Sequence, residues 1–286
     1  MEKNVALALS SGGPRGFAYI GAIEVLQERG YTITSVSGTS AGALVGGIFA
    51  AGGMDAFKQW LCALDPVQVV KLMDFTPSRN YLVKGDKVIR AIKSRVPDVR
   101  IEELPVPFCA VATDWLHGRE VVFRKGSLFD AIRASISLPS FFSPVRRDGM
   151  ILIDGGIVNP IPLNRVARTE GDILMGVDVS GHDYEGQTEL QKVMDAKQKR
   201  DRSIAKSLLA RLIPDDIEFN YITLLSRTSS LMIRQNSKLM VELFRPDLLL
   251  DIQLGRFGSF DYDKSEKLVA IGRQRTRRLL QRVATT

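Results

Sequence analysis

The chain of 286 residues contains little of what several large classes of protein depend on. It has two cysteines, Cys62 and Cys109, which are too few for a disulfide scaffold, so we expect a reduced protein. It has two histidines, His117 and His182, and neither has a partner at the spacing of a metal site. We therefore expect no metal and no cofactor. The longest uncharged apolar run, 41–54, is interrupted by glycines and is shorter than the roughly 20 residues that cross a bilayer.

The start of the chain and its charge bear on where the protein works. The first four residues and the five apolar residues after them do not match a signal peptide, so we expect a cytoplasmic protein. Most of the formal charge of +7 lies in the C-terminal half, in 192–211 (seven basic against two acidic residues) and 264–282 (seven against one). Such runs are typical of solvated helix faces, and peripheral contact with an anionic membrane surface is the open alternative. No nucleic-acid-binding module is recognisable, and the sequence gives no oligomeric state.

Strand-like and helix-like segments alternate along a chain with 45% hydrophobic residues, which predicts a single α/β domain. We expect a three-layer α/β/α architecture with a mostly parallel central sheet. The predicted core covers about 4–182, and a basic, helical C-terminal extension of about 186–286 packs on it. The predicted strands are 5–10, 33–38, 108–113, 120–124, 151–154, 173–179 and 248–252, and the clearest helices follow the first two strands and cover 128–135.

The most informative motif is Gly-Thr-Ser-Ala-Gly at 38–42, between a β-branched run and an Ala/Gly-rich segment. It places Ser40 on a sharp turn from strand to helix, which is typical of a nucleophile elbow. Gly38 and Gly42 have no Cβ atoms, so strand and helix can approach closely around the serine. By itself the motif is short enough to occur by chance, and its meaning depends on the rest of the chain.

A glycine-rich turn follows the first predicted strand, with Gly12, Gly13, Pro14, Arg15 and Gly16 leading into an amphipathic helix. Such a turn directs backbone N–H groups and a helix N-terminus at one point, which favours a negative charge there. The turn is therefore predicted to be an oxyanion hole or a phosphate cradle. A dinucleotide-binding loop is the rival interpretation, but a serine stands where that fingerprint has its first glycine.

The third motif is a short apolar strand that ends in Asp154, Gly155 and Gly156. A carboxylate at the end of one strand can face the end of a neighbouring strand, where it can act as a base. An aspartate before two glycines is also a common turn former. Asp154 is therefore a candidate catalytic residue whose alternative is a purely structural turn.

Together these motifs resemble the patatin-like phospholipase family, in particular its compact bacterial members. The turn at 12–16 is similar to the family's oxyanion loop, 38–42 to its nucleophile elbow and 154–156 to its Asp-Gly-Gly/Ala motif. Further similar segments are 112–114 with Gly118, 134–139 (Ala-Ser-Ile-Ser-Leu-Pro), 245–247 and 260–261. The resemblance thus covers nearly the whole chain in a fixed order.

The resemblance implies an acyl-ester hydrolase with a Ser-Asp dyad, acting on a lipid or another acyl ester and requiring no metal. Ser40 would be the nucleophile and Asp154 the general base. The oxyanion would lie among the N–H groups of Gly12, Gly13 and Ala41. The resemblance gives a supporting role to Arg15, Gly16, Gly38, Gly42, Gly155 and Gly156. Two positions depart from the family's usual loop: a serine at 11, and Pro14, which cannot donate.

Two other functions remain open from the sequence. The order Ser40, Asp154, His182 is that of α/β-hydrolases with a full triad, and His182 follows the predicted strand 173–179. Alternatively, the chain is a lipid-binding or regulatory protein on the same fold with weak or absent catalysis, which the loop departures allow. The apolar segment 57–75 is either an interfacial lid or two short helices packed on the sheet. His117 is expected to be a solvated hairpin residue.

Overall fold

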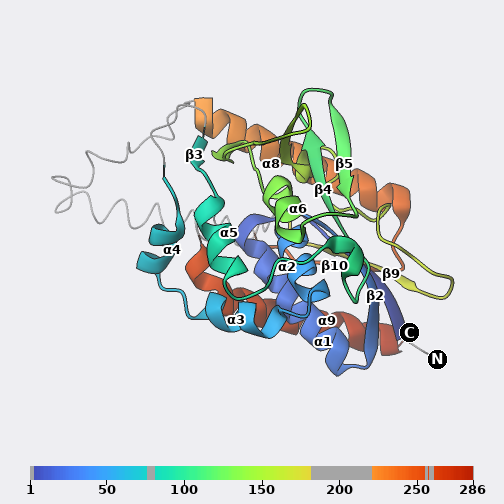
Figure 1. The fold of residues 1–286 in the computed structure, drawn as a ribbon. Helices are drawn as coiled ribbons and strands as arrows, with labels where there is room; N and C mark the ends of the chain where they lie inside the picture. Colours follow the sequence, from blue (N-terminus) through green and yellow to red (C-terminus); the bar gives the residue numbers. More distant parts are fainter. Residues whose placement is uncertain (1–2, 76–80, 182–220, 255–256, 258–260, 286) are drawn as a thin grey trace, which may run out of the picture.

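The computed structural model describes residues 3–75, 81–181, 221–254, 257 and 261–285 (Figure 1). Its strands are β1 (Lys3–Leu9), β2 (Tyr31–Thr39), β3 (Tyr81–Val83), β4 (Phe108–Asp114), β5 (Arg119–Phe123), β6 (Ser140–Phe142), β7 (Val145–Arg147), β8 (Met150–Asp154), β9 (Ile173–Asp178) and β10 (Leu248–Asp251). Its α-helices are α1 (Ala18–Glu28), α2 (Ala41–Ala50), α3 (Met54–Cys62), α4 (Pro66–Leu72), α5 (Asp86–Lys93), α6 (Leu128–Ser135), α8 (Tyr221–Phe244) and α9 (Ser265–Thr285). Short 3-10 helices are η1 (Gly13–Phe17), η2 (Ile101–Glu103), η3 (Gly155–Ile157) and η4 (Tyr262–Lys264).

The central sheet has eight strands in the order β10-β9-β1-β2-β4-β8-β7, with β5 paired to β4 outside this path. Strands β10, β9, β1, β2 and β4 run parallel to one another. Strands β5 and β8 pair antiparallel with β4, and β7 pairs antiparallel with β8. Parallel strands end at the same edge of a sheet, and this edge is where an α/β fold forms its sites. The sheet therefore brings the ends of β1, β2 and β4 to one side of the molecule.

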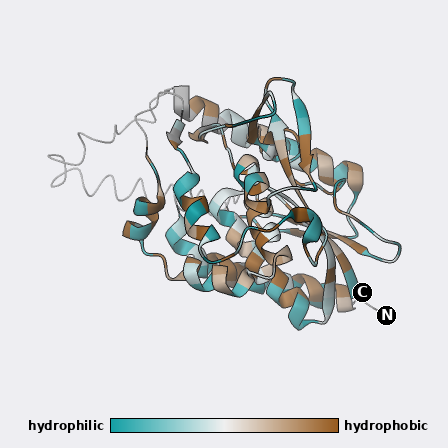
Figure 2. Ribbon diagram, in the orientation of Figure 1, coloured by the Kyte–Doolittle hydropathy of each residue, from teal (hydrophilic) through white to brown (hydrophobic). Residues whose placement is uncertain are grey.

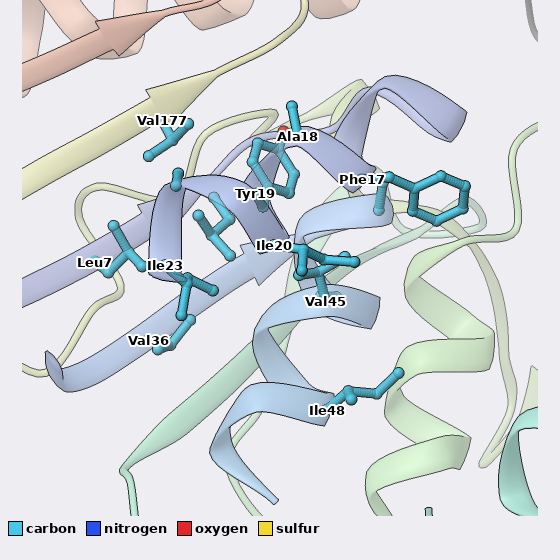
Figure 3. Packing of buried hydrophobic residues seen from close by; sticks show 14 of the residues in the cluster. Leu7, Phe17, Ala18, Tyr19, Ile20, Ile23, Val36, Val45, Ile48 and Val177 are labelled. Carbon is cyan, nitrogen blue, oxygen red and sulfur yellow. The ribbon is translucent and has the colours of Figure 1, made fainter. Parts of the chain in front are cut away.

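Helices cover both faces of this sheet, which confirms the predicted three-layer fold. Alternate residues of β1 point to opposite faces: Leu7 and Leu9 pack with α1 and α2, whereas Ala8 packs with the segment 159–167 and α8. Figure 3 shows the first of these contacts, in which Leu7 and Val36 of the sheet pack with four side chains of α1 and α2: Ile20, Ile23, Val45 and Ile48. Figure 2 shows that α2 carries almost no hydrophilic residues, as expected for a helix that is buried nearly all round.

The C-terminal part of the chain contributes to both the sheet and the helical layer. Strand β10 extends the sheet beside β9, and α9 packs along α1. The two helices approach closely at Gly21 and Gly272: a Cβ on Gly21 would lie 2.1 Å from the Val269 carbonyl oxygen, and one on Gly272 would lie 2.0 Å from that of Ala18. Larger residues at either position would force these helices apart.

The opposite face of β2 is tied to the segment that follows the Asp154 turn. Three alternate residues of the strand, Ser35, Ser37 and Thr39, donate side-chain hydrogen bonds to backbone carbonyls of 159–167. For Ser37 the acceptor is the Pro162 carbonyl at 2.8 Å. The polar side chains of a buried strand are thus satisfied by the backbone of a loop, as burial requires.

All seven strands expected from the sequence are present, and the helix expected at 128–135 is α6. The sequence missed β3, β6 and β7, each of which has three residues. The later part of the predicted helical stretch at 187–244 is α8, and its earlier part lies outside the described residues. The segment 57–75 forms α3 and α4: Phe57 and Leu61 of α3 belong to the core, whereas Val67 and Val70 of α4 are exposed.

Candidate active site

Ser40 occupies the turn between β2 and α2 and has a backbone conformation that an L-residue rarely adopts. Its φ is 56° and its ψ is −119°. Such a conformation costs on the order of 1–3 kcal/mol and persists only where its surroundings enforce it. The residue is 7% exposed. The structure thus has the strained strand-to-helix turn that the motif predicts.

The two glycines of the motif make this turn sterically feasible. A Cβ on Gly38 would lie 2.3 Å from the carbonyl oxygen of Gly42, and a Cβ on Gly42 would lie 2.2 Å from that of Leu9. These contacts are with backbone atoms, which cannot move aside as the end of a flexible side chain can. Gly38 and Gly42 therefore allow β2, α2 and β1 to pack at distances that no other residue permits.

Strand β4 brings Ser40 and Asp154 together. On one edge of β4, β2 ends with Thr39 opposite Val111, and β8 ends with Asp154 opposite Ala112. Both strands use this same edge, because β5 pairs with Val111 and Ala112 from the other side. Since Ser40 directly follows Thr39, β2 and β8 meet end to end with the hydroxyl and the carboxylate at the junction.

Asp154 is buried at this junction with few partners. It is 1% exposed, and its Oδ1 accepts a hydrogen bond of 2.7 Å from the N–H of Gly156. Its Oδ2 has no hydrogen bond of normal geometry to any residue that the structure describes. Burial raises the pKa of Asp154 to about 6, while the Ser40 hydroxyl and the Gly156 N–H act in the opposite direction. A carboxylate with a pKa near neutrality and an open lone pair beside a serine is suited to accept its proton.

The glycine-rich turn lies next to both residues. A Cβ on Gly16 would lie 2.5 Å from the Cβ of Ala41, and one on Gly156 would lie 2.9 Å from the Oγ of Ser11. Gly13 has a φ of 56° and open space on its Cβ side. Its N–H and that of Ala41 are the first of η1 and α2, and the first N–H groups of a helix have no partner within it.

Arg15 and Tyr19 hold this turn from behind. The Nε of Arg15 donates to the carbonyl of Gly12 at 3.1 Å. The hydroxyl of Tyr19, which is fully buried, donates to the carbonyl of Ser10 at 2.7 Å and lies 2.9 Å from its Oγ. The Ser10 Oγ in turn accepts from the Val179 N–H at 3.1 Å. These hydrogen bonds connect the glycine-rich turn to the residues that directly follow β1 and β9. Of the residues that make them, the sequence motif indicates only Arg15.

The C-terminal end of α6 supports both candidate catalytic residues, which the sequence did not predict. The Oγ of Ser135 accepts from the Ser40 N–H at 2.8 Å and donates to the Val111 carbonyl at 2.6 Å. The carbonyl of Ser137 accepts from the Asp154 N–H at 2.9 Å. The segment 134–139 is similar to the family in sequence, but the partners lie far away along the chain and no local pattern identifies them.

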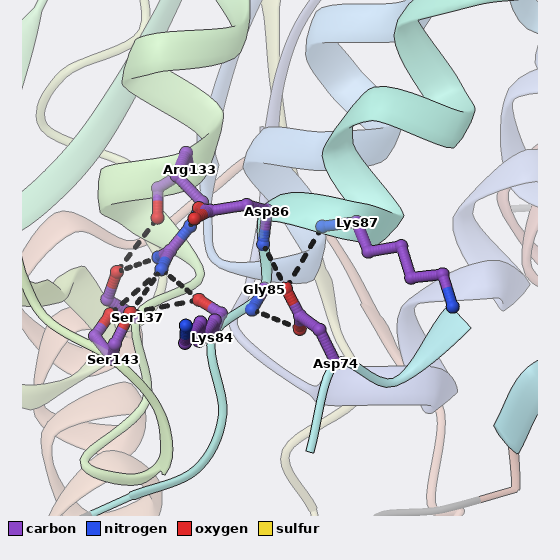
Figure 4. Close-up of polar contacts among 8 residues, drawn as sticks. All are labelled: Asp74, Lys84, Gly85, Asp86, Lys87, Arg133, Ser137 and Ser143. Carbon is purple, nitrogen blue, oxygen red and sulfur yellow. Dashed lines mark hydrogen bonds and ion pairs between the residues drawn. The ribbon is translucent and has the colours of Figure 1, made fainter. Parts of the chain in front are cut away.

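Arg133 connects this end of α6 to β3 and α5, as Figure 4 shows. Its guanidinium donates to the Oγ of Ser137 at 2.7 Å and to the Oγ of Ser143 at 2.7 Å, and it also contacts Lys84 and Asp86. Asp74 accepts from the N–H groups of Gly85, Asp86 and Lys87 and so caps the start of α5. Arg133 is 9% exposed, and each such bond offsets the cost of burying its charge.

The remaining titratable residues considered in the sequence lie elsewhere. His117 is in the β4–β5 hairpin, where its Nδ1 lies 2.5 Å from the Oδ2 of Asp114, so it is bonded rather than merely solvated. His182 lies outside the described residues. Tyr262 of η4 is a further neighbour: its ring centroid is 6.0 Å from that of Phe17, and burial and the charge of Asp154 raise its pKa.

The fold and the site together define a three-layer α/β protein with a strained serine and a buried carboxylate at the ends of two strands. Sequence comparison then identifies the family: the model of the patatin-like phospholipases matches residues 7–167, more than half of the chain. The chain therefore belongs to the patatin-like phospholipase family.

Two curated relatives agree with this assignment. An uncharacterized NTE family protein of Mycobacterium tuberculosis (strain ATCC 25618 / H37Rv) is 44% identical over 177 residues, which are 62% of this chain and 49% of the relative. The patatin-like phospholipase domain-containing protein 7 of Rattus norvegicus is 33% identical over 201 residues, 67% of this chain and 14% of the relative. The crystal structure of VipD from Legionella pneumophila aligns with 98% of this chain and 67% of its own at 17% identity and a TM-score of 0.48.

The chain spans about half the length of the first curated relatives that it matches. Within the residues that the structure describes, no helix is long and apolar enough to cross a membrane.

Proposed function

We propose that the chain is a serine hydrolase of acyl esters that uses Ser40 and Asp154 as a dyad and passes through an acyl-enzyme. The observation that supports this most strongly is the end-to-end meeting of β2 and β8 on β4, which puts a strained serine beside a carboxylate with an open Oδ2. An Oδ2 without a hydrogen-bond partner among the described residues leaves a lone pair with which Asp154 can accept the serine proton.

In the first half of the proposed reaction, the Oγ of Ser40 attacks the ester carbonyl carbon while Asp154 takes the hydroxyl proton. The carbonyl oxygen becomes an oxyanion. When the tetrahedral intermediate collapses, the bond to the alcohol breaks and Asp154 returns the proton to the leaving oxygen. The acyl group stays on Ser40 as an ester.

The second half regenerates the enzyme with water. Asp154 takes one proton from a water molecule, whose oxygen attacks the acyl carbon. Collapse of the second intermediate releases the carboxylic acid, and the proton on Asp154 returns to the Oγ of Ser40. The same carboxylate thus acts as base and then as acid in each half, as microscopic reversibility requires.

The N–H groups of Gly12, Gly13 and Ala41 are the proposed donors to the oxyanion. The N–H of Ser40 is already bonded to Ser135, so the elbow offers the N–H of Ala41 instead. Removal of a single such donor typically costs about 10²–10³ in rate. Pro14 has no N–H, and the serine at position 11 donates its own N–H to the Pro160 carbonyl at 2.7 Å, so neither departure from the family's loop takes away one of these donors.

The proposed substrate class is a phospholipid or lysophospholipid, with simple carboxyl esters as assay substrates. The name of the family and that of the rat relative support this class.

The test is reaction of the purified chain with a fluorophosphonate ester, followed by intact mass and peptide mapping. We expect a single adduct on Ser40, and the same adduct at the same rate in His182→Ala. Loss of the adduct in His182→Ala would assign a Ser-Asp-His triad instead. Absence of any adduct on the folded protein would favour a lipid-binding or regulatory role.

A further inference from the structure

Exposed apolar side chains gather at the tip of the hairpin between β4 and β5. Trp115 is 63% exposed and Leu116 is 52% exposed, although Asp114 directly before them is fully buried. Four residues, 115–118, form the turn at this tip. Large apolar side chains at the end of a projecting hairpin have no core to pack on, so their exposure calls for a partner.

The hairpin projects from the edge of the sheet that carries the candidate active site. Strand β2 ends opposite Val111, whereas β4 continues for three further residues to Asp114. At about 3.3 Å per residue, the tip therefore lies roughly 10 Å beyond the Ser40 turn along the strand direction. Figure 1 shows this hairpin standing out from the body of the molecule.

A second tip lies beside the first. The N–H of Trp115 donates to the Ile151 carbonyl at 2.8 Å, and Arg147 pairs with Met150 across the β7–β8 turn. We call residues 114–119 and 145–150 the twin tips. Their exposed charged side chains include three arginines, Arg119, Arg146 and Arg147, against one exposed carboxylate, Asp148.

The first tip is held rigidly rather than left loose. The buried Asp114 accepts from Nδ1 of His117, at 2.5 Å, and from Nε of Arg119, at 3.3 Å, both on its Oδ2. Burial alone would raise the pKa of Asp114, but the hydrogen bond and charge of His117 and the bond from Arg119 hold it below its usual value. The polar side chains of the turn are thus bonded inward, which leaves Trp115 and Leu116 outside.

We propose that the twin tips are an interfacial anchor that inserts Trp115 and Leu116 into an anionic lipid surface. Tryptophan is favoured at the boundary of membrane and water because its ring is apolar and its N–H remains polar. Each arginine near an anionic surface adds attraction, and the three arginines outnumber the two carboxylates of the twin tips, Asp114 and Asp148. The purpose of this anchor, to bring lipid to Ser40, rests on the proposed function, but the anchoring itself can be measured without catalysis.

The experiment measures binding of the full chain to vesicles of phosphatidylglycerol and phosphatidylcholine, and to phosphatidylcholine alone. Trp60→Phe leaves Trp115 as the single tryptophan. We expect its emission to shift to the blue on binding and to be quenched by lipids brominated in their acyl chains. Trp115→Ala/Leu116→Ser should weaken partitioning about tenfold or more. Arg146→Gln and Arg147→Gln should each weaken binding to the anionic vesicles about fivefold, and less in high salt.

Leu231→Ser is the matched control, since Leu231 is an apolar side chain of α8 that is 60% exposed and lies outside the twin tips. An equal loss of binding in this control would overturn the proposal, as would Trp115 emission that saturating anionic vesicles leave unchanged. A dimer that the tip variant dissociates, with no vesicle binding by the original chain, would assign the tips to a second copy instead. Hydrolysis of a soluble short-chain ester should be the same in the tip variants. If no protein hydrolyses it, the proposed function fails while the vesicle result stands.

Discussion

The turns at Ser40 and Asp154 meet at one junction, yet they differ in what makes them energetically costly. Ser40 sits in a strained backbone conformation, with φ 56°, while its backbone N–H is bonded to Ser135. Asp154 has an ordinary φ of −50°, but its carboxylate is buried with one oxygen unpartnered among the described residues. The turn at Ser40 is thus destabilised by backbone strain, whereas the turn at Asp154 is destabilised by the burial of a charged carboxylate. A substitution at one turn should therefore remove the backbone strain, and a different substitution at the other should remove the buried charge.

The largest expected effect is on catalysis, where the two sides should behave as one unit. Ser40→Ala and Asp154→Asn should each lower kcat of ester hydrolysis by about 10³–10⁴, because each removes one half of the proton transfer. The double variant should be hardly slower than either single one. Steady-state kinetics of the three proteins test this, and additive losses would show that the two residues act independently.

The electrostatic cost should appear as a stability that depends on pH. A carboxyl whose pKa is raised by folding favours the folded state most at low pH, and this contribution is lost as pH rises through the folded value of about 6. At pH 8 the original chain carries the buried charge, so Asp154→Asn should be more stable by up to about 3 kcal/mol, the free energy that separates about 6 from the ordinary value of about 3.9.

Urea unfolding at pH 8 and pH 4 measures this difference, which should fall to about 0.5 kcal/mol at the lower pH, close to the ordinary pKa of the unfolded carboxyl. Asp148→Asn is the control, because the Asp148 side chain is 75% exposed. Equal stabilisation in both variants, or none in Asp154→Asn at pH 8, would contradict the assignment of the cost to burial.

The steric strain should respond to a substitution that leaves the charge untouched. Ser40→Gly should be more stable than Ser40→Ala by about 1–2 kcal/mol, because glycine adopts a positive φ without a Cβ penalty. Both variants lack the hydroxyl, so the comparison isolates the backbone. Thermal or urea unfolding of the pair provides the measurement, and equal stability would mean that the turn is not strained.

An effect of similar, small size is expected at the support that α6 gives to the serine turn. Ser135→Ala leaves the buried N–H of Ser40 without its acceptor, which should cost about 1–2 kcal/mol of folding free energy. Because the turn is then less constrained, kcat should fall while KM for a short-chain ester changes little. Ser94→Ala removes an exposed serine hydroxyl at the end of α5 and should change neither quantity.

The sequence predicts the individual strand ends well but not how they meet. Runs of apolar residues identify the strands that end at Ser40 and Asp154, and the resemblance pairs these two residues. The fact that β2 and β8 share one edge of β4 depends on pairing between distant segments, which periodicity does not encode. The strands β3, β6 and β7 were missed because three residues are too few for an alternating pattern.

The supporting residues were harder still to predict. Ser135 and Ser137 act through a hydroxyl and a backbone carbonyl whose partners lie in other elements. Arg133 is a charged residue on an otherwise ordinary amphipathic helix, and only the structure shows that it is buried among backbone carbonyls and serine hydroxyls. Local sequence carries no signal for such contacts, whereas Gly38 and Gly42 were recognisable because their steric role belongs to the motif itself.

The shared edge of β4 also restricts how this junction can evolve. Both β2 and β8 are hydrogen-bonded to the same edge of β4. A shift in the pairing register of either strand therefore moves its end by a whole number of residues along β4. One step along β4 is about 3.3 Å, which exceeds the range of a hydrogen bond, and it also turns the side chains to the opposite face of the sheet. A register shift would therefore separate the hydroxyl of Ser40 from the carboxylate of Asp154 altogether. Small changes in the geometry of the site can arise only in the loops and helices around this junction.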